Sequence, residues 1–374
     1  MPPIVIDLRQ AEDTRDVVHR AVQMLAEGKL VIFPTETVYG LGASARNAEA
    51  IERIYAAKGR NHDTPLALAI KSAEEAFDYV PRPGKIAERL ARRCWPGPVT
   101  LVVDNHHEES LLRQLPASVQ QAVAPKGSVG LRVPAHQIVL DVLGMLSGPI
   151  ALTSANLSGK GDAKTAEEAL SGLSDHVALV LNDGPCRYGQ PSTVVRVTDK
   201  SYNCLREGVV GKSALDRLSS MIVLLVCTGN TCRSPMGEAL LKKLAAEKFD
   251  CPLEELEQHG VVVASAGVAA LPGCAASVEA VEFMKEKGID LSKHESQPLT
   301  DKLVRHADLI FAMTNSHRHA ILRRWPEASS RTHTLRADGG DIADPIGGPA
   351  ELYRQCGDQV EAALKERLDS IDFS

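Results

Sequence analysis

Apolar segments of strand length recur through the first 200 residues of the chain. They are Leu30–Phe33, Leu66–Ile70, Val99–Val103, Val129–Val133, Ile150–Thr153, Val177–Leu181 and Thr193–Val197. Between several of them, apolar residues follow the period of an α-helix, as at positions 17, 18, 21, 22 and 25. The pattern predicts a mixed α/β fold.

The pattern breaks near residue 211, where Gly211-Lys212-Ser213 opens a polar stretch that runs to Ser220. Met221 then begins a new strand, Ile222–Val226, and a long helical pattern follows from Pro235. We therefore predict a first domain at residues 1–212, a linker at 213–220 and a second domain at 221–374.

The second domain alternates strands and helices. Strands are expected at Val261–Ala264 and Asp308–Ala312, and helices at Ala275–Lys287, Ser316–Arg324 and Pro349–Leu368. This alternation predicts a parallel sheet covered by helices.

Composition excludes several classes of protein. The 374 residues suit two domains, and 42 basic against 48 acidic residues give a charge of −6, which argues against a broad nucleic-acid-binding surface. The eight cysteines include no Cys-x-x-Cys pair, which argues against a zinc site or any other metal centre. No apolar run approaches the ~18 residues of a membrane span, and no secretory signal is visible. We expect a cytoplasmic protein with no membrane segment.

Residues that suit phosphate binding follow the apolar segments of the first domain. The segment 34–42 (PTETVYGLG) places hydroxyls, a carboxylate and glycines after Leu30–Phe33, at a strand end where α/β sheets bind ligands. A tight turn is the alternative interpretation. A Walker-type P-loop sequence is absent.

Further cations and hydroxyls extend this candidate site. Lys58 and Arg60 would lie on the same side of an extended segment and suit a polyphosphate, although such pairs also occur on solvated surfaces. The segment 153–156 (TSAN) places two hydroxyls and an amide at a strand end, or caps a helix. Arg132 and Arg206 add guanidinium groups beside strands.

Seven motifs occur in the order PTETVYGLG, KGR, WPGPVTLV, VGLRVPAH, LTSANLSG, PSTVV and LREG. Through them, residues 5–212 resemble the YrdC-type threonylcarbamoyl-AMP synthases. The resemblance implies a twisted α/β sheet with a large, positively charged cavity. It also implies that L-threonine, bicarbonate and ATP are joined into threonylcarbamoyl-adenylate and pyrophosphate, towards N6-threonylcarbamoyladenosine in tRNA. Implied partners are tRNA and a threonylcarbamoyl-transferase, with double-stranded RNA binding.

The same resemblance assigns roles to individual residues. ATP, together with Mg²⁺, would be bound by Lys58, Arg60, Ser154, Asn156 and Arg206. Threonine would be bound by Thr35, Arg132, Thr153 and Ser192, with Arg132 the natural partner of its carboxylate. The sequence departs from the family pattern at Ala69, where many relatives have a histidine, and nothing like the extra C-terminal domain of the long family members follows residue 212.

The segment 226–235 (VCTGNTCRSP) carries the strongest local signal. Cys227 ends a predicted strand, five residues separate it from Arg233, and a helix should begin near Ser234. Backbone N–H groups and a helix N-terminus would form an anion-binding loop that favours the nucleophilic thiolate. Arg233 could hold two phosphoryl oxygens, and Ser234 could donate to the thiolate. Gly229 or Asn230 would take the left-handed conformation. Thr228, Thr231 and Cys232 complete the loop; a buried core cysteine beside a chance arginine is the alternative.

A phosphocysteine route also requires a general acid for the leaving group. Asp344, in the segment IADPIGG, is the best candidate, although an Asp-Pro pair often only forms a turn. Asp338 and Asp341 are the nearby alternatives.

Residues 221–374 resemble the low-molecular-weight protein phosphatases through CTGNTCRSPM, the Ser-Ala-Gly at 265–267, the Ala-Asp-Leu-Ile at 307–310 and the late Asp-Pro. The resemblance implies a four-stranded parallel sheet flanked by helices and no cofactor. Cys227 would be the nucleophile, Arg233 the phosphate clamp and Asp344 the acid, while Cys232 could trap oxidised Cys227 as a disulfide. Thioredoxin-coupled arsenate reductases share the loop but need closely spaced further cysteines, whereas Cys251, Cys274 and Cys356 lie far apart.

The chain is therefore predicted to be a bifunctional enzyme that acts on phosphorylated proteins with its second domain. Thr231 and the later DPxGG resemble the bacterial protein-arginine phosphatases, which favours phosphoarginine, although Ile346 replaces their usual aromatic residue. A protein-tyrosine phosphatase is the alternative for this domain. An alternative of another class is a non-catalytic, RNA-binding YrdC-like module joined to a regulatory or redox thiol domain.

Overall fold

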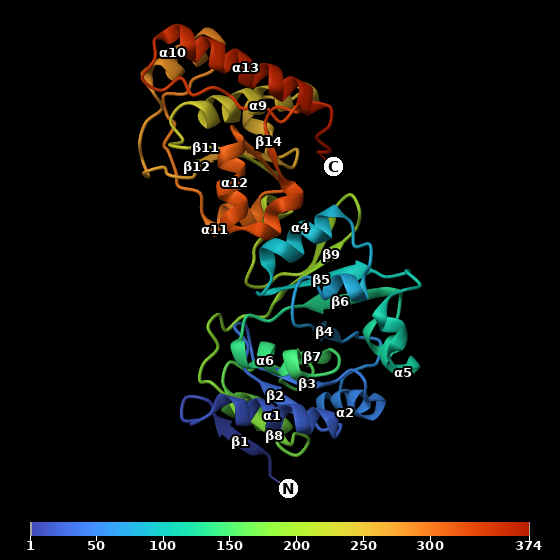
Figure 1. The fold of residues 1–374 in the computed structure, drawn as a ribbon. Helices are drawn as coiled ribbons and strands as arrows, with labels where there is room; N and C mark the ends of the chain where they lie inside the picture. The colour runs from blue at the N-terminus through green and yellow to red at the C-terminus, as the bar shows by residue number, and fades with distance from the viewer. Residues whose placement is uncertain (1, 374) are drawn as a thin grey trace. The chain divides into compact units, whose positions relative to one another are not determined.

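The computed structural model describes residues 2–373 (Figure 1), and the chain divides into two compact units, residues 1–215 and 216–374. Most of the predicted linker is helical, because residues 212–219 form helix α8 (Lys212–Ser219). This stretch contains neither proline nor glycine, and its Leu215 is fully buried. The polar composition had indicated a loop. The limits of the two predicted domains themselves stay a prediction.

The first unit contains a mixed sheet whose strands lie in the order β1-β8-β2-β3-β7-β4-β6-β5-β9-β10. In that order the strands are β1 (Ile4–Asp7), β8 (Leu179–Asn182), β2 (Val31–Phe33), β3 (Gly40–Ser44), β7 (Ile150–Ser154), β4 (Ala67–Ala69), β6 (Ser128–Arg132), β5 (Val99–Asp104), β9 (Thr193–Val197) and β10 (Tyr202–Arg206). The sheet combines parallel pairs such as β5/β9 with antiparallel pairs such as β3/β7. The predicted α/β class is confirmed.

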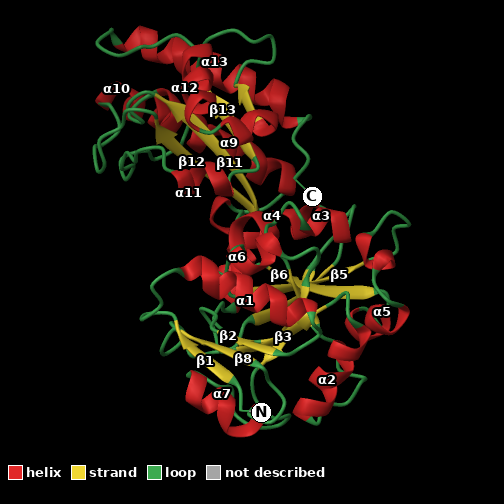
Figure 2. Ribbon diagram, turned by 60° about the horizontal axis from the view of Figure 1, so that its bottom comes forward, coloured by secondary structure: helices red, strands yellow, loops and turns green. Residues whose placement is uncertain are grey.

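Helices pack on this sheet, as Figure 2 shows. They are α1 (Thr14–Ala26), α2 (Ala48–Lys58), α3 (Ala76–Tyr79), α4 (Lys85–Cys94), α5 (Ala117–Val123), α6 (Gln137–Met145) and α7 (Ala166–Leu173), with a 3₁₀ turn η1 (Leu111–Gln114). The apolar faces of α1 and α6 form one core with Val31, Phe33 and Ile150 of the strands. The amphipathic pattern read at residues 17–25 is the buried face of α1.

Strand β3 lies where the Gly-x-Gly sequence had also allowed a tight turn. It pairs antiparallel with both β2 and β7. A Cβ atom on Gly40 would lie 2.8 Å from Leu152, and one on Gly42 would lie 2.8 Å from Ile150. A larger residue at either position would force these neighbouring side chains to shift, because they cover the strand closely.

The second unit contains a parallel sheet with the order β12 (Val261–Gly267), β11 (Met221–Cys227), β13 (Leu309–Ala312) and β14 (Thr332–Thr334). The expected four-stranded parallel sheet is thus confirmed. Its helices are α9 (Arg233–Phe249), α10 (Val278–Glu286), α11 (Asp301–His306), α12 (Asn315–Arg324) and α13 (Ala350–Leu368), with 3₁₀ turns η2 (Leu253–Glu255) and η3 (Pro326–Arg331).

Two cores cover the two faces of this parallel sheet. Val223 and Leu225 of β11 pack with α9, α10 and α13, while Leu224 and Val226 pack with α11 and α12. Alternate residues of a strand point to opposite faces, so the continuous apolar run at 222–226 is the signature of a strand buried on both sides. Within residues 2–373, no helix combines the length and the apolar character needed to cross a membrane.

Candidate active sites

A cavity of about 390 Å³ lies over one face of the first unit's sheet. Residues two apart on neighbouring strands line it: Ala67 and Ala69 on β4, Ser128 and Gly130 on β6, Val194 and Arg196 on β9. This spacing points their side chains to the same face, and the small ones leave the space open. The loop after β2 contributes Thr35, so the predicted ligand site at that strand end opens onto the sheet face.

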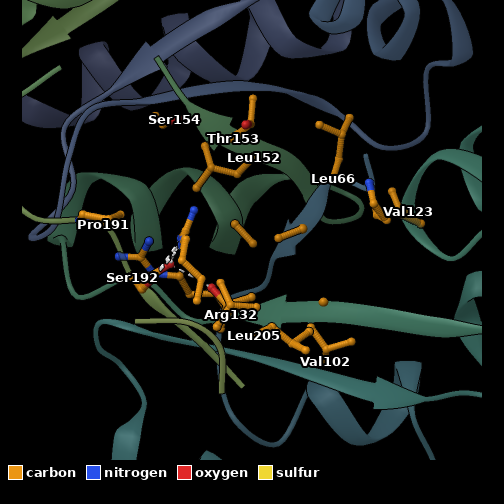
Figure 3. Close-up of a pocket in the computed structure, with 18 of the residues that line it drawn as sticks. Leu66, Val102, Val123, Arg132, Leu152, Thr153, Ser154, Pro191, Ser192 and Leu205 are labelled. Atoms are coloured by element: carbon orange, nitrogen blue, oxygen red, sulfur yellow. Dashed lines mark hydrogen bonds between the residues drawn. The ribbon is translucent and has the colours of Figure 1, made fainter. Parts of the chain in front are cut away.

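Several cations gather at this cavity. Arg60, Arg132 and Arg206 line it, and Figure 3 shows labelled side chains around it, among them Arg132, Thr153 and Ser192. Burial and the neighbouring Arg60 lower the pKa of Lys58 to about 8. Burial also lowers the pKa of Arg60 and of Arg206, and other guanidinium groups add to both shifts. Partly desolvated cations that disfavour one another's charge are stabilised by an anion, so the cavity is suited to phosphate.

The sequence analysis had supposed that Lys58 and Arg60 lie in an extended segment, and this is wrong. Lys58 is the last residue of α2, and Gly59 caps that helix in the left-handed conformation with φ of 57°. The ammonium group of Lys58 donates to the backbone oxygen of Ser154 and, at 2.6 Å, to that of Asn156. Lys58 therefore fixes the loop that follows β7.

Arg60 and the TSAN segment come together at the cavity wall. The Arg60 guanidinium donates to Thr153 Oγ1 at 3.1 Å, and Ser154 Oγ lies 2.5 Å from Asn156 Oδ1. Thr153 and Ser154 line the cavity, whereas Lys58 and Asn156 form the layer behind them. Four of the five residues predicted to bind ATP therefore belong to one cluster. The fifth, Arg206, also lines the cavity but lies outside this cluster.

Arg132 is held by a carboxylate that the sequence analysis had not assigned a role. Its Nη2 donates to Glu36 Oε1 at 2.7 Å and to Thr37 Oγ1 at 2.9 Å, and Glu36 Oε2 accepts from the Ala135 N–H at 3.0 Å. Both charged side chains are buried. The signal for Glu36 was its place inside PTETVYGLG, because a buried carboxylate needs a cation from another segment.

Ser192, Arg206 and Ala69 complete the cavity. Arg206 Nη2 donates to the Ser192 backbone oxygen at 2.8 Å and to its hydroxyl at 3.1 Å, and the same hydroxyl lies 3.0 Å from Thr100 Oγ1. Ala69 lines the cavity and pairs in register with Arg132, so a histidine at this position would lie beside that guanidinium.

The second unit places its nucleophile candidate at the end of β11. Cys227 is buried, its Sγ accepts from the Asn230 N–H at 3.2 Å, and it lies 3.0 Å from Ser234 Oγ. Asn230 takes the left-handed conformation with φ of 55°. Helix α9 begins at Arg233, directly behind the loop. A backbone N–H, a hydroxyl group and a helix N-terminus thus converge on the sulfur.

Arg233 and Asp344 meet beside this loop. Arg233 is buried and forms an ion pair with the half-exposed Asp344, and its Nη1 donates to the Ile342 backbone oxygen at 3.3 Å. The two alternatives for the acid are turned to other partners: Asp338 binds Arg336, and Asp341 accepts from the Asn315 N–H. Geometry therefore favours Asp344.

Polar side chains within the loop and from distant segments hold the loop in place. The Asn230 amide donates to Ser234 Oγ at 3.0 Å and to Ser265 Oγ at 2.9 Å, and His294 Nε2 contacts the Asn230 backbone oxygen at 2.8 Å. A Cβ on Gly267 would lie 2.4 Å from the Thr228 backbone oxygen, so only glycine fits there. Of the distant residues, Ser265 and Gly267 belong to the Ser-Ala-Gly at 265–267, which gave a signal, whereas nothing in the sequence pointed to His294.

His317 is a further buried member of the site. Its Nε2 lies 2.8 Å from Thr228 Oγ1, its Nδ1 lies 2.9 Å from Thr314 Oγ1, and Arg233 Nη2 reaches the same Thr228 hydroxyl at 3.5 Å. Burial, and then the charge of Arg233, lower the pKa of His317 to about 4. A neutral imidazole therefore connects α12 to the loop.

Cys232 is buried beside the hydroxyls of Ser277 and Tyr353, at 3.3 Å and 3.8 Å. Thr231 is half-buried, with its Oγ1 3.6 Å from Cys232 Sγ, and Ile346 is exposed after the Asp-Pro. Thr231 and Ile346 therefore both occupy the rim of the loop and not the core.

Two family models match the chain. The Sua5/YciO/YrdC model, described as telomere recombination, matches residues 23–208, and the low molecular weight phosphotyrosine protein phosphatase model matches residues 222–373. The chain belongs to both families. Residues 1–215 form the YrdC unit and residues 216–374 the phosphatase-family unit.

Individual relatives agree with this assignment. A threonylcarbamoyl-AMP synthase from Pyrococcus abyssi is 37% identical over 205 residues, which are 55% of this chain and 57% of the relative. A protein-arginine-phosphatase from Geobacillus stearothermophilus is 44% identical over 153 residues, 40% of this chain and 95% of that phosphatase. The solved structure of P. abyssi Sua5 complexed with L-threonine has 25% identity and a TM-score of 0.52, covering 70% of this chain and 92% of the other. The chain spans less than three fifths of the length of the synthase relatives from P. abyssi and Bacillus subtilis.

Proposed function

We propose that the YrdC unit forms threonylcarbamoyl-adenylate from L-threonine, bicarbonate and ATP, and that the phosphatase-family unit removes phosphate from proteins through Cys227. The first proposal rests on the cavity that Arg60, Arg132 and Arg206 line together with hydroxyl groups, with Lys58 behind its wall, and on the synthase relatives. The second rests on the contact of Cys227 with Ser234, on the ion pair between Arg233 and Asp344, and on the phosphatase relatives.

In the first reaction, the threonine amine combines with bicarbonate to give a carbamate with loss of water. A carbamate oxygen then attacks the α-phosphorus of ATP, and pyrophosphate leaves. The chain's contribution is positioning and charge stabilisation. Arg60, Ser154 and Arg206 would contact the phosphates, while Lys58 and Asn156 would hold the loop that carries Ser154 and add charge behind it.

Threonine would occupy the same cavity beside Arg132. Arg132 donates from Nη2 to Glu36 and Thr37 and from Nε to the Gly97 backbone oxygen. Because Arg132 lines the cavity, its Nη1 can bind a carboxylate there. Thr35, Thr153 and Ser192 supply hydroxyls around it. The P. abyssi Sua5 structure complexed with L-threonine supports an amino-acid site in this fold.

Magnesium would accompany ATP. No cluster of three or more histidine, cysteine or acidic side chains suited to a metal occurs within residues 2–373, so the ion would be held mainly by phosphate oxygens. Ser154 Oγ and Asn156 Oδ1 are protein oxygens that fit beside it. When bound, it would neutralise charge on the leaving pyrophosphate.

In the second reaction, the Cys227 thiolate attacks phosphorus while Arg233 and the loop amides bind the phosphoryl oxygens. Asp344 donates a proton to the leaving group, then takes one from the water that attacks phosphocysteine and releases inorganic phosphate. Ser234 and the Asn230 N–H stabilise the thiolate before attack and after its release. No cofactor is required for this chemistry.

Phosphoarginine is the favoured substrate. Thr231 places a hydroxyl at the rim of the loop, where it suits a polar guanidine leaving group better than an aliphatic wall would. The 44% identity to a protein-arginine-phosphatase supports this choice.

The adenylate formed by the YrdC unit is labile, so its acceptors would be tRNA and a threonylcarbamoyl-transferase. We propose the cytoplasm, where ATP and tRNA occur, as the place of action.

Two product assays test these proposals on the intact chain. Mass spectrometry should detect threonylcarbamoyl-adenylate after incubation with ATP, Mg²⁺, L-threonine and bicarbonate, and should not detect it with Arg60→Ala. Phosphate release from a phosphoarginine peptide should disappear in Cys227→Ser. ATP binding without adenylate formation would favour a non-catalytic RNA-binding module. If Cys227→Ser still released phosphate and the wild type lost this activity only after oxidation, a redox thiol domain would be favoured.

A further inference from the structure

Five exposed apolar side chains lie on the segments that surround the phosphate loop of the second unit. These residues, here termed the apolar rim, are Val268, Leu271, Val278, Ile346 and Leu352. Leu271, Val278 and Ile346 are 73%, 68% and 70% exposed. Apolar side chains gathered at one place on a surface mark a region that contacts another molecule.

Hydrogen bonds tie the rim segments to the phosphate loop. The Val268 N–H donates to the Cys227 backbone oxygen at 2.9 Å, and the Ser277 N–H, next to Val278, donates to the Thr231 backbone oxygen at 2.9 Å. On the other side, the Ile346 N–H donates to Asp344 Oδ1 at 3.3 Å. Val268, Val278 and Ile346 are therefore held beside the site, and Leu271 lies on the segment between the first two.

The charge on these segments is of one sign. Residues 267–279 and 341–353 contain Glu279, Asp341, Asp344 and Glu351 and no lysine, arginine or histidine. Among residues 2–373, Glu279, Asp341 and Glu351 form no ion pair. Carboxylates without a basic partner thus lie on two segments beside a loop whose own chemistry binds an anion, and Arg354, the residue that follows the second segment, pairs with Glu286.

We propose that the rim selects phosphorylated protein segments whose flanking residues are basic and apolar. This inference rests on the proposed phosphatase function and specifies its substrate class. The phosphoryl group would enter the loop, where Arg233 and the backbone amides bind it. Lysine or arginine residues nearby in the substrate would be attracted by Glu279 and Glu351, and an aliphatic or aromatic neighbour would cover Leu271 or Ile346.

Matched phosphopeptides test the proposal with the intact chain. One peptide carries a phosphoarginine flanked by lysine and leucine, a second replaces the lysines with glutamate, and a third replaces the leucines with serine. Each kcat/KM is divided by that for p-nitrophenyl phosphate in the same preparation. We expect the first peptide to exceed the second by about fivefold or more, with the ratio shrinking at high salt. The third peptide should also fall below the first.

Charge reversal supplies the matched comparison. Glu279→Lys with Glu351→Lys should bring the ratio of the first to the second peptide to about one or below. The control, Glu254→Lys with Glu257→Lys, adds the same charge before β12, at the end of the sheet opposite Gly267, and should keep the wild-type ratio.

Equal turnover of the three peptides, or the same change in both double variants, would overturn the rim proposal while leaving the phosphatase function in place. Absence of turnover on p-nitrophenyl phosphate and on every peptide would instead overturn the proposed function itself.

Discussion

Glu36 and Arg132 form a buried ion pair, 2.7 Å between Oε1 and Nη2, beside the cavity of the YrdC unit. Removing one member of such a pair leaves the other charge uncompensated, so Arg132→Met should lower the free energy of unfolding by about 3–5 kcal/mol. The double variant Arg132→Met/Glu36→Gln should regain part of that stability, measured by urea denaturation.

Activity should not follow stability in this series. If Arg132 binds the threonine carboxylate, the double variant will keep a much higher KM for L-threonine even where its stability is restored. Glu36→Gln alone should raise that KM less, because the cation is still present. A wild-type KM in the double variant would show that Arg132 only supports the fold.

ATP affinity should fall as the pH rises through about 8. The pKa of Lys58 is lowered to about 8, so the ammonium is protonated below that value and loses its charge above it. A bound triphosphate favours the protonated form, and binding above pH 8 therefore requires uptake of a proton. Calorimetry with a non-hydrolysable ATP analogue from pH 7 to 9.5 measures the effect.

Lys58→Arg is the control for this dependence, because a guanidinium keeps its charge throughout that range. It should bind with a weaker pH dependence than the wild type, whatever its affinity at pH 7. The same slope in both proteins would remove Lys58 from the phosphate site.

His317 should destabilise the second unit as the pH falls from 6.5 towards 4. The pKa of this imidazole is lowered to about 4, so between these values the unfolded chain binds a proton that the folded chain does not. Stability from this group is present above the unfolded pKa and is lost on acidification. Denaturation of wild type and His317→Gln at several pH values should show a steeper loss in the wild type, whereas parallel curves would contradict it.

Thr231→Ile should shift the second unit from phosphoarginine towards phosphotyrosine. The substitution exchanges a hydroxyl at the loop rim for an aliphatic surface that suits a phenyl ring. The ratio of kcat/KM for the two phosphopeptides measures the shift, and Thr231→Ser, which keeps the hydroxyl, should stay close to the wild type. Better phosphotyrosine turnover by the wild type, unchanged by Thr231→Ile, would reverse our assignment.

The sequence pattern predicted elements that have strong local signals and missed those defined by tertiary contacts. The run at 222–226 is apolar throughout because β11 is buried on both faces, and it was identified at once. In contrast, the sequence of β3 resembles a turn because it contains Gly40 and Gly42. These positions suit glycine because side chains of β7 lie close to them, which the sequence does not show. The three-residue β14 and the polar edge strand β10 are too weakly patterned to identify.

The candidate sites show the same division. Residues that the motifs singled out contact one another in the structure: Arg60 contacts Thr153 in the first unit, and Arg233 contacts Asp344 in the second. Glu36 and His317 were missed, since their partners, Arg132 and Thr228, lie about 90 residues or more away in the sequence. Sequence alone does not show which distant polar groups a buried charge will meet.

Pyrophosphate release from ATP by the intact chain tests the central claim most directly. The account predicts release that requires L-threonine and bicarbonate together, because the adenylate forms only from their carbamate, and that is lost in Arg60→Ala. Release that proceeds without either substrate, or no release from a folded protein that binds ATP, would contradict a synthase function for the YrdC unit.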